Sequence, residues 1–156
     1  MRLMNGSISI GDFSSNLDFF IKKAINISQT KSSNLTPMAK KKKVLITDDD
    51  HEGMTLMKLA LEEEFEIVCA YTGQEALTSY EGDPEIALIL MDGRMPVMDG
   101  FEAAKAIKKI RPELPIICIS SYEVEPEYGE YFVCHLRKPF SMCKELLPVV
   151  KRILQT

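Results

Sequence analysis

The sequence predicts an α/β fold built on a five-stranded parallel sheet. From Lys43 onward, short runs rich in apolar and β-branched residues alternate with segments of helical periodicity. Such alternation is typical of a parallel sheet with right-handed crossover connections. Three of the five runs are almost continuously apolar, as expected for parallel strands that are buried on both faces. The length of 156 residues is enough for one such domain and a short appendage.

The predicted strands span residues 43–47, 65–70, 86–91, 114–120 and 131–137, and the predicted helices span 52–64, 73–81, 100–110 and 143–155. Three of these helices have one apolar stripe at spacings of three and four residues. The stripes are Met54, Met57 and Leu61; Phe101, Ala104 and Ile107; and Leu146, Val150 and Ile153. Pro148 lies early in the last helix, so we expect an irregular first turn or a later start there.

Polar residues stand where four of the predicted strands end. In open parallel sheets, ligands bind outside the carboxyl ends of the strands, so these residues predict a single site at one edge of the sheet. They are Asp48, Asp49 and Asp50 after the first strand, Asp92 after the third, Ser120 at the end of the fourth, and Lys138, followed by Pro139, after the fifth.

The aspartates Asp48, Asp49 and Asp92 predict a binding site for a hard cation. Unit charges 4 Å apart repel by roughly 1–4 kcal/mol at effective dielectric constants of 80 to 20, so three neighbouring carboxylates stay ionised only beside a compensating cation. All the candidate ligands are oxygen atoms, and this favours Mg²⁺ over zinc. With Lys138 and a hydroxyl group nearby, the site suits phosphoryl transfer to Asp92.

Four motifs resemble the receiver domain of two-component response regulators. They are "KVLITDDD", "LILMDGRMPVMDGFE", "IICISS" and "LRKPF", in that order. The resemblance covers roughly residues 40 to 156 and implies a flavodoxin-like sheet of strand order 2-1-3-4-5. It further implies a phosphorylation-dependent signalling switch of a two-component phosphorelay, in the form of a stand-alone receiver that is not a turnover enzyme.

The resemblance also implies a role for each residue of the site. Asp92 is the implied phosphoacceptor, which takes a phosphoryl group from the phosphohistidine of a sensor histidine kinase or a phosphotransfer protein. Mg²⁺ is held by Asp49, Asp92 and the backbone carbonyl of Arg94, and by Asp48 through water. The residues implied to bind the phosphoryl group or to switch are Lys138, Ser120 and His135, and Pro139 follows a cis peptide bond.

The segment between the last two strands departs from the family pattern. Pro126 and Gly129 interrupt helical periodicity, so the fourth helix is expected to be short or absent. We expect residues 121–137 to be loosely packed and to become ordered when a phosphoryl group binds.

The chain is predicted to divide into an N-terminal extension, residues 1–37, and a receiver domain, residues 38–156. The extension contains a possible amphipathic helix with Leu17, Phe20 and Ile21 on one stripe, followed by a polar linker; disorder is the alternative. Residues 1–37 have a net charge of +2 and the remainder −6. The four lysines at 40–43 are expected to be a solvated lead-in to the first strand.

Composition limits the partners of the chain. The acidic domain lacks the clustered cations of a nucleic-acid-binding surface, and no apolar run reaches the length of a membrane span, so neither direct nucleic-acid binding nor membrane insertion is expected. The four cysteines lack metal-site spacing and are expected to be reduced thiols of a cytoplasmic protein. The expected downstream partner is another protein.

One alternative of a different class remains open from the sequence. The segment "ITDDDHEG" is similar to the strand-end D-x-D of haloacid-dehalogenase-type phosphatases. These enzymes also form an aspartyl phosphate with Mg²⁺, but they turn over a substrate. That family expects further acidic ligands after its lysine, and only Glu145 follows Lys138 in this chain.

Overall fold

The computed structural model describes residues 40–155 together with Asp18, Ile21 and Lys22. The chain separates into two units, Met1–Met38 and Ala39–Thr156, and the fold reported below is that of the second. The predicted helix and linker of the N-terminal extension lie outside the described residues, apart from the three residues named above. Their structure, and the domain boundary before residue 38, stay predictions.

The described elements alternate as predicted. The strands are β1 (Lys43–Thr47), β2 (Glu66–Ala70), β3 (Ile86–Asp92), β4 (Ile116–Ser120) and β5 (Cys134–Arg137). The α-helices are α2 (His51–Leu61), α3 (Gly73–Gly82), α4 (Gly100–Ile110) and α5 (Leu147–Leu154). Two shorter helical segments are η1 (Pro126–Tyr131), which is a 3₁₀ helix, and η2 (Met142–Leu146), which is a π-helix.

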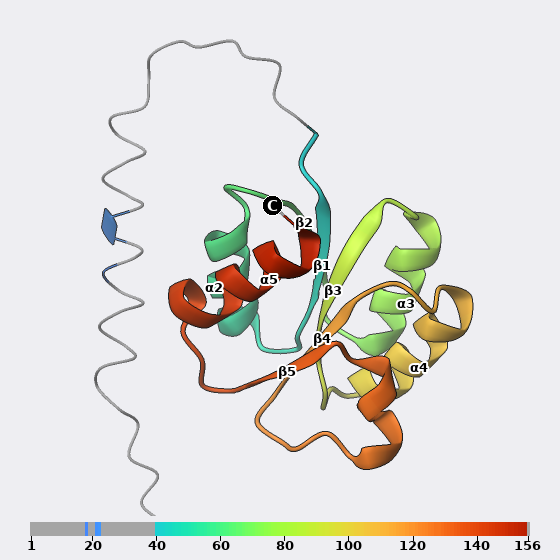
Figure 1. The fold of residues 1–156 in the computed structure, drawn as a ribbon. Helices are drawn as coiled ribbons and strands as arrows, with labels where there is room; N and C mark the ends of the chain where they lie inside the picture. Colours follow the sequence, from blue (N-terminus) through green and yellow to red (C-terminus); the bar gives the residue numbers. More distant parts are fainter. Residues whose placement is uncertain (1–17, 19–20, 23–39, 156) are drawn as a thin grey trace, which may run out of the picture. The chain divides into compact units, whose positions relative to one another are not determined.

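The five strands form one parallel sheet in the order β2-β1-β3-β4-β5. This confirms the predicted order 2-1-3-4-5. Figure 1 shows the sheet between two layers of helices, with α2 and α5 on one face and α3 and α4 on the other. The central strand β3 is buried along almost its whole length, because helices cover both of its faces. The residue that ends it, Asp92, is therefore held by the best-packed part of the molecule.

Side-chain caps set the start of three helices. In each case a side-chain oxygen accepts hydrogen bonds from backbone N–H groups of the first turn, which have no partner inside the helix. Asp50 caps α2 in this way, Thr72 caps α3 and Asp99 caps α4. Asp50 thus has a structural role that separates it from Asp48 and Asp49.

Several element boundaries differ from the prediction. Strand β4 begins only after Pro115, which has no N–H group to donate to a neighbouring strand. Strand β5 begins at Cys134, because η1 and the turn after it occupy the residues before. The helix predicted over 52–64 ends at Leu61. Near Pro148, the expected irregular start is observed: α5 begins at Leu147 and follows the π-turn of η2.

The predicted apolar stripes form much of the core. All three stripe residues of α2 and of α4 are buried. In the last helix the prediction is wrong for Ile153, which is partly exposed, while Leu154 is buried. The four cysteines are free thiols, of which only Cys118 is fully buried.

The fourth crossover is made by η1 in place of a full helix. This confirms the prediction of a short fourth helix, and the six residues of η1 include none that is buried. The aromatic residues Tyr131 and Phe132 nevertheless pack against the hydrophobic core from the end of this segment. The crossover is therefore short and exposed, and it contacts the core through two aromatic residues at its end.

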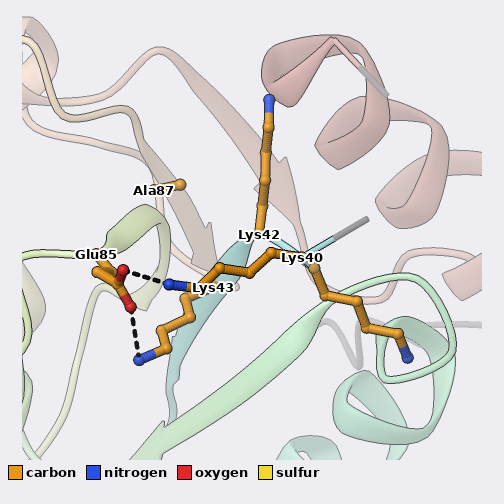
Figure 2. A pocket seen from close by; sticks show the side chains of 6 residues that line it. Lys40, Lys42, Lys43, Glu85 and Ala87 are labelled. Carbon is orange, nitrogen blue, oxygen red and sulfur yellow. Dashed lines mark hydrogen bonds and ion pairs between the residues drawn. The ribbon is translucent and has the colours of Figure 1, made fainter. Parts of the chain in front are cut away.

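The four lysines before and at the start of β1 make specific contacts at the amino edge of the sheet. Figure 2 shows Lys40 and Lys43 converging on Glu85 beside a pocket of about 260 Å³. Lys41 donates to the backbone carbonyl of Glu62, at the end of α2, at 2.9 Å, and Lys42 donates to a carbonyl at the end of α5. Lys40 and Lys42 are exposed, as expected of a solvated lead-in, and each of the four ammonium groups also has a partner.

Candidate functional site

The carboxyl edge of the sheet brings together three aspartates. Asp48 and Asp49 directly follow β1, and Asp92 is the last residue of the neighbouring strand β3. Carboxylate oxygens of the three residues all lie within 4.8 Å of one another. Asp48 and Asp92 are buried, whereas Asp49 is exposed. The sheet topology thus concentrates negative charge at one place.

Lys138, which follows β5, supplies a positive charge to this cluster. Its Nζ lies 2.7 Å from Oδ2 of Asp48 and 3.5 Å from Oδ2 of Asp92. Burial opposes the charge on Lys138, but the two carboxylates outweigh that effect and raise the pKa of the ammonium group. Asp48 also accepts a hydrogen bond from the backbone N–H of Asp50 at 2.9 Å. Asp48 therefore holds the lysine beside Asp92.

The carboxyl group of Asp92 has an unusual acidity. Burial raises its pKa from 3.8 to about 6. The nearby ammonium group of Lys138 lowers the pKa, the charges of Asp48 and Asp49 raise it, and a hydrogen bond from the N–H of Arg94 lowers it. One lysine does not compensate for the burial and the two neighbouring carboxylates. A bound cation would supply the missing positive charge.

The oxygen atoms around the Asp92 carboxylate suit a hard divalent cation. They comprise carboxylate oxygens of Asp48, Asp49 and Asp92; the resemblance implies the backbone carbonyl of Arg94 as a further ligand. Mg²⁺ binds through one or more carboxylates together with water, and it tolerates few other donor types. The residues present therefore fit Mg²⁺, and they could hold it at the carboxyl edge of the sheet.

Ser120 ends β4 with its side chain buried next to the loop that follows Asp92. Its Oγ accepts a hydrogen bond from the N–H of Tyr122 at 3.1 Å, so the hydroxyl hydrogen is available to another acceptor. A Cβ atom built on Gly93 would lie 3.1 Å from this Oγ and 2.6 Å from the ring of Phe101. Glycine at position 93 thus lets the loop pass close to Ser120.

His135 lies on β5, and its side chain is partly buried. The ring atom Nε2 is 3.3 Å from the backbone carbonyl oxygen of Ser120. The Lys138–Pro139 peptide bond is cis, the isomer that the resemblance implies. The residues singled out from the sequence are therefore gathered around the ends of β1, β3, β4 and β5.

The backbone around Asp92 is closely packed, and sequence reasoning missed two features of it. A Cβ atom on Gly100 would lie 1.8 Å from the carbonyl oxygen of Asp92, so the first turn of α4 rests directly on the end of β3. The dipeptide Asp99-Gly100, expected only to start a helix, is the signal for this contact. Val97, in the same loop, has a positive φ of 71° and is 93% exposed. No pattern in the sequence points to that conformation.

Sequence reasoning also missed the side chain of Arg94. Its Nη2 donates to Oε1 of Glu125 at 2.8 Å, and its Nη1 lies 3.6 Å from Oδ2 of Asp99. The guanidinium group stands over the ring of Phe101, 5.3 Å from its centroid. Only the backbone carbonyl of Arg94 was expected to matter.

Comparison with known proteins assigns the chain to a family. The model of the response regulator receiver domain matches residues 44–144, which include every residue of the cluster described above. The chain belongs to the response regulator receiver family. This match gives no support to the haloacid-dehalogenase alternative.

Curated relatives of this receiver domain are much longer proteins. The regulatory protein AtoC of Escherichia coli is 32% identical over 118 residues, which cover 72% of this chain and 25% of AtoC. The autoinducer 1 sensor kinase/phosphatase LuxN of Vibrio campbellii is 35% identical over 85 residues, which cover 54% of this chain and 10% of LuxN. This chain therefore corresponds to about a quarter or less of their length.

Solved receiver structures resemble this fold closely. The response regulator TrrA of Thermotoga maritima, in complex with Mg²⁺ and BeF, has a TM-score of 0.66 and 30% identity, over 72% of this chain and 98% of TrrA. The chemotaxis protein CheY4 of Vibrio cholerae has a TM-score of 0.65 and 29% identity, over 74% of this chain and 99% of CheY4. Among the described residues of this receiver, no helix is long and apolar enough to cross a membrane.

Proposed function

We propose that this receiver domain is a phosphorylation-dependent switch of a two-component phosphorelay. It accepts a phosphoryl group onto Asp92 from the phosphohistidine of a sensor histidine kinase or a phosphotransfer protein, and it signals by a change in what its surface binds. The observation that carries the proposal is the position of the Asp92 carboxylate. It ends the central strand, it is buried, and it lies 3.5 Å from Lys138 in a cluster with two other carboxylates.

In the transfer step, a carboxylate oxygen of Asp92 attacks the phosphorus atom, and the P–N bond of the phosphohistidine breaks. The electron pair of that bond stays on the imidazole nitrogen, so Asp92 becomes an aspartyl phosphate. Mg²⁺ held by Asp49, Asp92 and the Arg94 carbonyl, and by Asp48 through water, would neutralise charge on the phosphoryl oxygens. The domain promotes its own phosphorylation and is not a turnover enzyme.

Three residues position the phosphoryl group in this proposal. Lys138 already faces Asp92 and donates to a phosphoryl oxygen, while Asp48 keeps the lysine in place. Ser120 donates its free hydroxyl hydrogen to a second phosphoryl oxygen. Because the ring of His135 contacts the carbonyl of Ser120, a displacement of Ser120 moves His135 as well. This contact gives His135 a switching role.

The partners follow from the transfer chemistry. The donor is a phosphohistidine protein, and the relative LuxN, named as a sensor kinase/phosphatase, supports this choice. The acceptor of the signal is another protein, which recognises the changed surface of the phosphorylated domain. We propose that both encounters take place in the cytoplasm.

Intact-mass analysis after incubation with acetyl phosphate and Mg²⁺ tests the proposal. The wild-type chain should gain one labile phosphoryl group, EDTA should prevent the gain, and Asp92→Asn should abolish it. Asp83→Asn is the matched control, since Asp83 is a carboxylate paired with Lys43 at the opposite edge of the sheet. Labelling that persists in Asp92→Asn, or that is lost equally in Asp83→Asn, would overturn the assignment.

A further inference from the structure

Three side-chain contacts join the η1 segment to the loop after Asp92 and to α4. At its start, Oε1 of Glu125 accepts a hydrogen bond from Arg94 at 2.8 Å. In its middle, the hydroxyl of Tyr128 donates to Glu102 of α4 at 2.7 Å, and the ring of Tyr128 packs on Phe101 at a centroid distance of 5.2 Å. These contacts hold η1 against α4 and the loop after Asp92 in the absence of a phosphoryl group.

Arg94 connects this segment to the reacting atoms through its backbone. Its N–H group is hydrogen-bonded to the carboxyl group of Asp92, and its carbonyl is a proposed ligand of Mg²⁺. Its guanidinium group lies over Phe101 and reaches Glu125 and Asp99. One residue thus contacts both the phosphoacceptor and the element that replaces the fourth helix.

We propose that Arg94 is a phosphorylation-sensitive clasp, whose guanidinium group leaves Glu125 for the phosphoryl group on Asp92 and so releases η1. This inference rests on the proposed function of Asp92. Before phosphorylation, the carboxylate of Glu125 binds the guanidinium group of Arg94. The side chains of Arg94 and Glu125 are about half exposed, at 50% and 52%, so water and salt weaken their attraction. A phosphoryl group carries close to two negative charges, and its oxygens match the fork of donors on arginine.

The ring of Phe101 is a further partner of the guanidinium group, whose Cζ lies 5.3 Å from the ring centroid. A guanidinium group is attracted to an aromatic ring by the charge distribution of the ring. That attraction does not depend on which anion binds the guanidinium group at the same time. Arg94 can therefore exchange Glu125 for a new anion while it stays over Phe101. Once Glu125 is free, only Tyr128 and the aromatic residues at the end of η1 still anchor the segment.

Beryllofluoride with Mg²⁺ is the probe for this clasp, because it mimics a phosphoryl group on an aspartate. Fluorine NMR first reports whether beryllofluoride is bound, and amide hydrogen exchange over residues 124–131 then reports the state of η1. In the wild-type chain we expect exchange in this segment to become about two- to fivefold faster, the range that follows from loss of one exposed ion pair.

Two variants separate the clasp from general loosening. Glu125→Gln should already exchange faster before beryllofluoride is added, and it should respond little to the addition. Glu123→Gln is the control, because Glu123 makes an ion pair with Arg137 at 2.6 Å, more exposed than that of Glu125, and its described ion pair does not involve Arg94. It should keep the wild-type response to beryllofluoride.

The outcomes distinguish this inference from the proposed function. Bound beryllofluoride with unchanged or slower exchange in η1 would overturn the clasp and leave Asp92 as the phosphoacceptor; slower exchange would support the ordering expected from the sequence. A wild-type response in Glu125→Gln would likewise overturn the clasp. Absence of any bound fluorine signal would overturn the proposed function, and the clasp with it.

Discussion

The two ends of strand β1 carry opposite charges, and the fold treats these charges differently. At the amino end, each of the lysines at 40–43 meets a carboxylate or a carbonyl at the end of a helix. Helix ends of that kind are partially negative, so these contacts are favourable. At the carboxyl end, Lys138 is the one described cation within ion-pair distance of Asp48 and Asp92, and none lies that close to Asp49.

This difference shows how the charges of the candidate phosphorylation site differ from charges that only join helices and strands together. Several charged side chains lie close together at each end of β1, so the number of charges does not distinguish the two ends. At the amino end the charges are paired and at least partly exposed, so they join elements together. At the carboxyl end two carboxylates are buried and under-compensated, and the pKa of Asp92 is raised to about 6. In the proposed function, a cation and a phosphoryl group supply the interactions that this arrangement lacks.

Packing gives the largest expected difference between the two edges. A Cβ atom on Gly100 would lie 1.8 Å from the carbonyl oxygen of Asp92, where only backbone could yield. We expect Gly100→Ala to lower the free energy of unfolding by about 3 kcal/mol. At Gly82, at the end of α3, an added Cβ meets nothing within 4 Å, so Gly82→Ala should change stability by no more than about 1 kcal/mol. Urea unfolding compares them, and equal stability would contradict the close packing at Asp92.

Replacement of Lys138 tests whether the charges at the carboxyl edge of the sheet are under-compensated. Lys138→Met leaves the fully buried Asp48 without its cation, so we expect a loss of about 2–3 kcal/mol in EDTA. Mg²⁺ should restore much of that stability, since it supplies the missing charge at the same edge. The stability of Lys43→Met, a variant at the amino edge, should not change when Mg²⁺ is added. Thermal melts of both variants in EDTA and in Mg²⁺ are the measurement, and a rescue of Lys43→Met would remove the distinction between the edges.

The acidity of Asp92 predicts an unusual pH dependence of the metal-free protein. Its pKa is raised in the folded state to about 6 from 3.8, so between those values the folded chain binds more protons than the unfolded chain. Stability should therefore fall as pH rises from about 4 to about 6, by about 1–3 kcal/mol from this group. Asp92→Asn should lack that component. Urea unfolding in EDTA across this range measures it, and identical profiles for the two proteins would count against the raised pKa.

Two adjacent aspartates give the smallest and sharpest contrast. In EDTA, Asp49→Ala should raise the free energy of unfolding by about 0.5 kcal/mol, because it removes one of three repelling carboxylates from an exposed position. It should also weaken Mg²⁺ binding. Asp50→Ala removes the cap of α2 and should lower stability by about 1 kcal/mol. Calorimetry of both variants would show opposite shifts, and a destabilised Asp49→Ala would contradict the account of repulsion.

The fold and the main site could be predicted because their signals are local. Continuous apolar runs predicted the strands, and the polar residues after them lie at one edge because parallel strands share a direction. The rest depends on contacts between distant and exposed side chains. The partner of Arg94 is 31 residues away, and the partner of Lys42 is 112 residues away. No periodicity encodes such pairs, so the contacts of the lysines and of Arg94 emerged only from the structure.

The loop at Val97 has a consequence for engineering of this domain. A β-branched residue at a positive φ costs on the order of 1–3 kcal/mol, and Val97, with a φ of 71° and 93% exposure, gains little packing in return. We expect Val97→Gly to stabilise the domain, because relief of this strain exceeds the entropy that glycine adds to the unfolded chain. Because the position lies five residues after Asp92 and faces solvent, it also offers an attachment point for a fluorescent reporter of the phosphorylation state.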